Sequence, residues 1–282
     1  MNSFQIKVLG CVLMLIDHSA IFFGGIPYMS LVMHWLGRAS APLFLFQCGW
    51  SCAHTHNIRR YALRLYIASV AMVAAEAITN MNNNIFTCLL HVTVLIWILS
   101  RPRLADRIWG IVGYVCWQIV TTALVALVIP VMGYAGVWGE LGVLVMLTVL
   151  GNCYVIEGGY CMVLFGVLLW RFRDSKAGLA AAFVGFSAVM LLVTNSGYTI
   201  SQQSGMEAAS AVLALLWPNA ANGIWSPFLN NYQWMMALAL PILLSFTGER
   251  GKPVMWFFYV FYPAHLLIIK ALMAVLGVTV GV

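Results

Sequence analysis

The sequence predicts an all-α integral membrane protein, a polytopic bundle of about nine to eleven transmembrane helices. Hydrophobic residues make up 63% of the 282 residues and charged residues only 8%, whereas a soluble domain carries about 25% charged residues. The apolar runs approach the roughly 20 residues that a helix needs to cross a hydrocarbon core of about 30 Å. No internal repeat, soluble segment or long linker interrupts them, so residues 1–282 are expected to form a single membrane domain.

The expected spans follow one another along the chain and are separated by polar, basic or Gly- and Pro-containing segments that favour loops. They cover residues 8–23, 39–53, 62–78, 85–99, 108–131, 141–155, 160–170, 179–193, 234–246 and 254–276. The first has no Ala-x-Ala-like cleavage site, so it is interpreted as a retained span and not as a signal peptide. Residues 206–217 are apolar but too short to cross easily, and are expected to be interfacial or re-entrant.

Basic residues gather in four loops, at residues 59–64, 101–107, 171–176 and 250–252. Because Lys and Arg favour cytoplasmic loops, this pattern predicts an internal N-terminus and an even number of spans between any two of these loops. Three spans are expected between residues 107 and 171, however. Either one of them fails to cross, or the Arg171 loop faces outward and residues 206–217 cross. The net charge of +6 is spread over short loops, which argues against a nucleic-acid partner.

The seven cysteines are scattered through apolar runs, without the clustered spacing of a zinc site. We expect buried structural thiols and no metal.

Two adjacent ionisable residues, Asp17 and His18, lie in the middle of the first span. From Lys7 to Asp17 a helix rises about 15 Å, half of the hydrocarbon core, where ionisable groups are costly and are functional candidates. Their side chains point about 100° apart, so they are expected to reach different neighbours. They form either a buried polar cross-link between helices or a site in which His18 acts as a base.

A second candidate base, His265, lies in the last span behind Tyr262 and Pro263. Tyr262 and His265 share a helix face, and Pro263 can open room for a polar group by kinking the helix. His91, in the span over residues 85–99, is expected to be an ordinary core residue.

Several arginines are expected near the cytoplasmic surface. Arg60 and Arg64 share one face of a helix, and Arg38 precedes the span over residues 39–53. They are either positive-inside charges or ligands of phosphate groups. Arg250 lies between Gly248 and Gly251 in a tight turn that is either structural or a contact for a ligand.

An ordered set of short motifs resembles the TraX family, and it extends over nearly the whole chain. The motifs lie at residues 15–18, 37–49, 55–65, 84–89, 248–251 and 258–266. The resemblance implies a multi-pass acetyltransferase of the bacterial inner membrane that transfers acetyl from acetyl-CoA to the N-terminal amine of a conjugative pilin. In this reading His18 is the base or an acetyl relay, Asp17 orients a partner, and His265 is a second base or a donor to the thioester carbonyl, with Tyr262 beside it. The implied CoA ligands are Arg38, Arg60, Arg64, Asn84 and Arg250.

Two other classes of function are compatible with the residues. One is a proton-coupled transporter of small solutes, in which Asp17, His18 and Glu76 relay protons. The other is a non-catalytic membrane partner in pilus biogenesis. The acceptor is not identified by the sequence, since an amine, a sugar hydroxyl and a lipid all suit acetyl transfer by a histidine.

Overall fold

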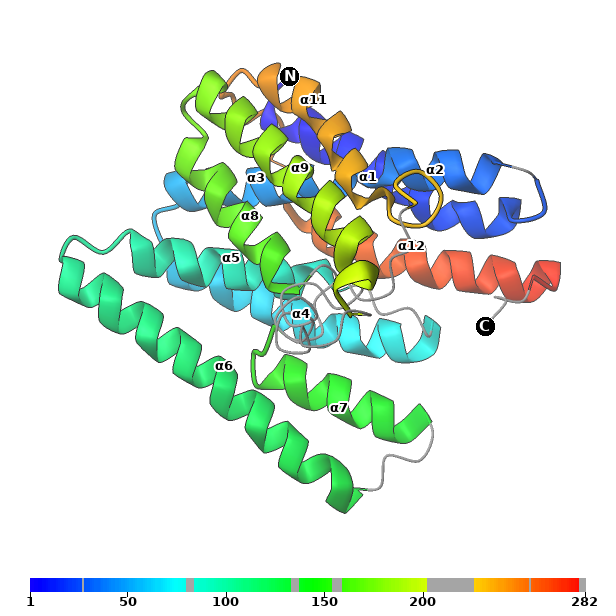
Figure 1. The fold of residues 1–282 in the computed structure, drawn as a ribbon, viewed down its shortest axis with the longest axis horizontal. Coiled ribbons are helices and arrows are strands. Elements are labelled where there is room, and N and C mark those ends of the chain that lie inside the picture. Colours follow the sequence, from blue (N-terminus) through cyan, green and yellow to red (C-terminus); the bar gives the residue numbers. More distant parts are fainter. Residues whose placement is uncertain are drawn as a thin grey trace. The chain divides into compact units, whose positions relative to one another are not determined.

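The computed structural model confirms the all-α prediction. It describes residues 1–26, 28–79, 84–132, 137–153, 159–201, 226–253 and 255–278, and no strand occurs among them. Figure 1 shows the arrangement of the helices. They are α1 (Ser3–Ser19), continued by the 3₁₀ helix η1 (Ala20–Phe23), α2 (Met29–Gly37), α3 (Ser40–His54), α4 (Ile58–Thr79), α5 (Ile85–Leu99), α6 (Leu104–Met132), α7 (Val137–Val149), α8 (Gly159–Phe172), α9 (Lys176–Ser201), the 3₁₀ helix η3 (Tyr232–Ala239), α11 (Leu240–Leu244) and α12 (Met255–Leu276).

The sequence predictions differ from these helices in two informative places. No span was predicted between residues 23 and 39, where the structure has α2, a helix of nine residues that is too short to cross a membrane. The span expected over residues 141–155 ends at Val149. Gly151 has a φ of 63°, and the Asn152 N–H donates to the Leu147 carbonyl at 2.8 Å. Together they form a Schellman motif, which ends the helix. The segment 206–217 lies outside the described residues.

Four of the described helices are long and apolar enough to cross a membrane. They cover Ser3–Phe23, Ile58–Thr79, Leu104–Val128 and Trp256–Leu276. The outer surface of α6 is apolar, with Trp109 and Leu127 each more than 70% exposed, which suits contact with lipid tails. The count of nine to eleven spans and the side of the Arg171 loop stay predictions.

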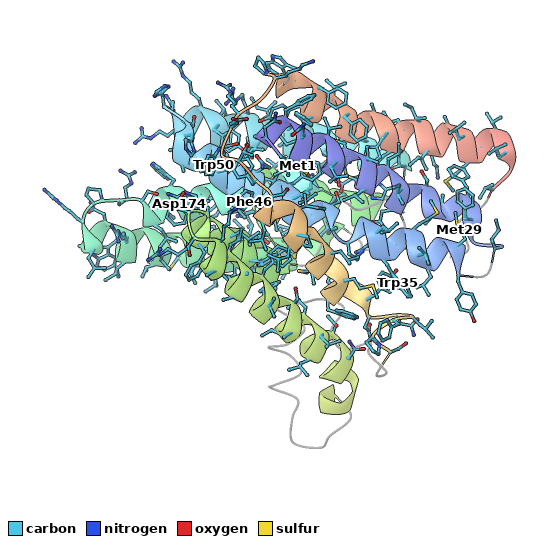
Figure 2. The ribbon with its side chains drawn as sticks, turned by 90° about the horizontal axis from the view of Figure 1, so that it is seen from above. Met1, Met29, Trp35, Phe46, Trp50 and Asp174 are labelled. Carbon is cyan, nitrogen blue, oxygen red and sulfur yellow. The ribbon has the colours of Figure 1, made fainter. Side chains whose placement is uncertain are left out.

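The chain divides into two compact units. Unit 1 comprises Met1–Gln47 and Leu168–Val282, and unit 2 comprises Cys48–Val167. In unit 1, α1 packs between α2 and α12 (Figures 1 and 2). The start of α1 is held by the turn before α12, where the Ser3 N–H donates to the Glu249 carbonyl at 2.8 Å.

Unit 2 contains a buried polar seam between α4 and α5. The Ser69 and Thr87 hydroxyls lie 2.7 Å apart, and the Asn84 amide donates to the Ser69 carbonyl at 2.9 Å. His91 is buried and hydrogen-bonds the Tyr114 hydroxyl at 3.0 Å, which confirms it as a core residue. The cysteines are mostly buried as expected, apart from exposed Cys116 and half-buried Cys161.

The close crossing of α1 and α2 depends on Gly37. A Cβ atom at this position would lie 2.3 Å from the Cβ of Asp17. We expect Gly37→Ala to destabilise the protein by about 1–3 kcal/mol, because the two helices must move apart. Gly185→Ala in α9 is the matched control, since nothing lies within 4 Å of its added methyl group. Thermal unfolding in detergent compares the two, and equal stabilities would contradict the close crossing.

Candidate functional site

Polar side chains from four segments of unit 1 meet around the end of α1. Asp17 and His18 diverge from adjacent positions, as the helical rotation of about 100° per residue requires. Asp17 turns toward α2 and its C-terminal cap, whereas His18 turns toward α12. One side chain therefore belongs to an ionic cluster and the other to a pair of histidines.

The ionic cluster is centred on the Asp17 carboxylate. Its Oδ1 atom lies 2.7 Å from Nδ1 of His34, and its Oδ2 atom accepts from Nη2 of Arg38 at 3.0 Å. The two partners are four residues apart at the end of α2, so they lie on one helix face. Both carboxylate oxygens are engaged, and the Arg38 charge offsets the Asp17 charge. This pairing reduces the cost of an ionised group at membrane depth.

Side chains from the start of η3 pack against this cluster. Arg38 donates from Nη1 to Oε1 of Gln233 at 3.1 Å, and its guanidinium lies 5.7 Å from the centroid of the Tyr232 ring. The His34 and Tyr232 rings are nearly parallel, with centroids 6.1 Å apart. Trp35, labelled on α2 in Figure 2, donates from Nε1 to the Phe228 carbonyl at 2.8 Å. These contacts hold the end of α2 against the segment that begins η3.

The second group is a hydrogen-bonded pair of imidazoles. Nδ1 of His18 lies 2.8 Å from Nε2 of His265, and the two rings are parallel within 3°. Stacked rings would keep their atoms about 3.5 Å or more apart, so these rings meet edge to edge in one plane. The geometry is that of an N–H···N hydrogen bond between imidazoles.

The direction of this hydrogen bond follows from the backbone of α12. Nδ1 of His265 lies 3.0 Å from the Phe261 carbonyl, which can only accept, so it carries the hydrogen. Nε2 of a neutral His265 is then an acceptor, and Nδ1 of His18 must donate to it. The lone pair of His18 is thereby assigned to Nε2.

The ionic cluster and the histidine pair form one electrostatic site. The charges of Asp17 and Arg38 act on His18, which follows Asp17 directly in α1. With neutral imidazoles the site has no net charge, since one carboxylate balances one guanidinium. The Tyr262 ring packs edge-on against His265 with centroids 5.4 Å apart, and α12 continues as a helix through Pro263.

The other predicted residues make none of the contacts described above for this site. Arg60 and Arg64 lie in the first turns of α4 in unit 2, and Arg250 is exposed in the turn before α12 in unit 1. Asn84 is buried, and its side chain caps α5 besides its bond to Ser69. Its amide is thus engaged in the packing of unit 2.

Sequence reasoning missed His34 and Gln233. The spacing of His34 and Arg38 was a usable signal, because residues four apart share a face once a helix is assumed. Gln233 gave no local signal, since its partner lies 195 positions away along the chain.

Among the described residues, no group of three or more His, Cys, Asp or Glu side chains is placed to hold a metal ion.

A family model described as "TraX protein" matches residues 3–273 of the chain. No curated protein and no solved structure matches it significantly.

Proposed function

Because the chain belongs to the TraX family, as its motifs indicated, we propose that it is a membrane acetyltransferase. Acetyl-CoA is the donor, and the acceptor is the N-terminal amine of a conjugative pilin presented in or across the bacterial inner membrane. The family resemblance supports the reaction class, and the residues of unit 1 support a base for it.

The single observation that carries the proposal is the hydrogen-bonded pair of His18 and His265. An α-amine has a pKa near 8 and must lose a proton before its nitrogen can attack a thioester. Nε2 of His18 takes a proton from the attacking nitrogen and returns it to the CoA sulfur as the C–S bond breaks. Nε2 of His265 accepts a hydrogen bond from Nδ1–H of His18, and this bond fixes the tautomer and the orientation of the base.

The phosphates of CoA are assigned to arginines. Arg60 and Arg64 are four residues apart on α4, and a guanidinium can donate two hydrogen bonds to a phosphate. Arg250 and Asn84 remain further candidates for CoA binding. Arg38 already donates to Asp17 and Gln233, so we assign it to the ionic cluster first.

Thiol release from acetyl-CoA tests the proposal. Purified wild-type protein is expected to release one thiol per acetylated peptide when given a peptide with the pilin N-terminus, and none when that N-terminus is blocked. Absence of thiol release with amine, hydroxyl and lipid acceptors would overturn the enzyme assignment. Solute flux into proteoliposomes would instead favour a transporter. If the protein showed neither thiol release nor solute flux, the function that remains would be that of a non-catalytic partner in pilus biogenesis.

A further inference from the structure

We infer that His34 is a second base of this site, and that Asp17 is the residue that positions it. The inference rests on the proposed function. In this assignment His34 takes the first proton from the acceptor ammonium. His18 takes the second proton from the same nitrogen and passes it to the CoA sulfur.

The geometry of Asp17 and His34 is that of a carboxylate–imidazole dyad. The carboxylate can only accept, so Nδ1 of His34 carries the hydrogen of the 2.7 Å contact. The lone pair of a neutral His34 is then on Nε2, on the far side of the ring from Asp17. A carboxylate that holds Nδ1–H fixes the tautomer and stabilises the imidazolium that forms when Nε2 takes a proton.

The packing limits the ways in which this dyad can move. Gly37 brings α2 so close to α1 that no Cβ atom fits beside Asp17. Arg38 holds the second carboxylate oxygen and is itself held by Gln233. The carboxylate therefore has a fixed position from which to orient His34.

The charged and titratable groups around His34 come from all the elements packed against it. They are Asp17 and His18 of α1, Arg38 at the end of its own helix, and Tyr232 of η3. The adjoining 3₁₀ helix η1 contributes none, because its residues are Ala, Ile, Phe and Phe. Asp17 is the one acidic group of this set among the residues that the structure describes, and Arg38 offsets its charge.

The proton balance of the reaction requires two transfers from nitrogen. An ammonium and a thioester give an amide, a thiol and one released proton. The nitrogen loses one proton before it attacks and a second after the N–C bond has formed, and the sulfur takes up only one of them as the C–S bond breaks. When the acceptor binds as the ammonium, one base passes a proton to solvent, while the other passes a proton to the leaving group.

The partners of the two bases distinguish them. His18 and His34 are both half-buried, but His18 is hydrogen-bonded to buried His265, whereas His34 is held by the Asp17 carboxylate. A carboxylate stabilises an imidazolium, so we assign to His34 the proton that leaves for solvent, and to the pair of His18 and His265 the transfer within the site. A hydroxyl acceptor loses only one proton and would need only one of these bases.

The pH dependence of H34N tests this assignment. Asparagine keeps an N–H near the position of Nδ1 and can still donate to Asp17, but it has no base. Without the base, the enzyme depends on acceptor that is already neutral. We expect kcat/KM of H34N for an amine peptide to fall about tenfold per pH unit below about pH 8, and to approach the wild-type value above it. His54→Asn is the matched control, since Nδ1 of exposed His54 makes a similar contact with the Trp50 carbonyl at 2.8 Å.

An acceptor that needs no deprotonation separates this role from a structural one. The same peptide with an aminooxy group at its N-terminus stays neutral at about pH 7, and H34N is expected to lose much less activity toward it than toward the amine peptide. A second variant, H34Q, is assayed in the same way, so that poor folding of one substitution does not decide the result.

If the wild-type protein is active, two results would overturn this inference and leave the proposed function standing. One is a pH profile of the variants that runs parallel to that of the wild type. The other is a loss that neither high pH nor the aminooxy peptide restores. A wild type that never releases thiol overturns the proposed function, and the inference with it.

Discussion

Replacing His18 by asparagine is expected to lower kcat about 10²–10⁴-fold, the usual contribution of a general base. The asparagine amide can still donate to Nε2 of His265 and so preserve the contact between α1 and α12, but the lone pair assigned to Nε2 of His18 is lost. Unlike H34N, this variant should not recover at high pH, because the proton that it transfers comes from the tetrahedral intermediate. The measurement is thiol release from acetyl-CoA as a function of pH.

Variants of His265 separate a positioning role from a catalytic one. Glutamine offers a carbonyl oxygen that can accept from Nδ1 of His18, whereas leucine offers no acceptor. We expect H265Q to retain much more activity than H265L, with both proteins folded as judged by thermal unfolding. Wild-type kcat in H18N, or equal activities of H265Q and H265L, would show that this pair is not the base.

Removal of the Asp17 carboxylate by Asp17→Ala is expected to destabilise the protein by about 3 kcal/mol. The change removes the carboxylate that offsets the charge of the Arg38 guanidinium, which lies in a largely buried site beside Gln233 and the Tyr232 ring. Thermal unfolding in detergent measures the effect.

Unit 1 also contains a matched control for this substitution. Asp174 lies 3.1 Å from Arg173 and is 68% exposed (Figure 2), so Asp174→Ala should cost less than about 1 kcal/mol. The double variant D17L/R38L should regain part of the stability, because it removes both charges together. Equal effects of D17A and D174A would contradict a buried ion pair at Asp17.

Much of the fold could be predicted from the periodicity and length of apolar runs. The helix over Ile85–Leu99 has the predicted bounds, and α12 (Met255–Leu276) lies within the span predicted over residues 254–276. The end of α7 was predicted too late, because the expected span continued past Gly151 and Asn152, although a glycine in the left-handed conformation ends the helix there.

Residues of the site could be predicted from the sequence where an ionisable side chain lies in the middle of an apolar run. Asp17, His18 and His265 stand out as ionisable groups in apolar runs, and the divergence of Asp17 and His18 follows from helix geometry alone. The identity of their partners depends on tertiary contacts. His34 meets Asp17 only because the chain reverses after η1 and Gly37 allows close approach, and nothing local connects Arg38 to Gln233.

The in-plane contact of His18 and His265 limits how many protons the pair can hold. A single hydrogen lies between Nδ1 of His18 and Nε2 of His265, while the Phe261 carbonyl holds the other hydrogen of His265. A proton added at Nε2 of His18 leaves this arrangement intact. A second would place two N–H groups face to face, and the 2.8 Å contact would open. The pair can therefore hold one added proton. A second added proton would break the hydrogen bond between His18 and His265, which joins α1 to α12.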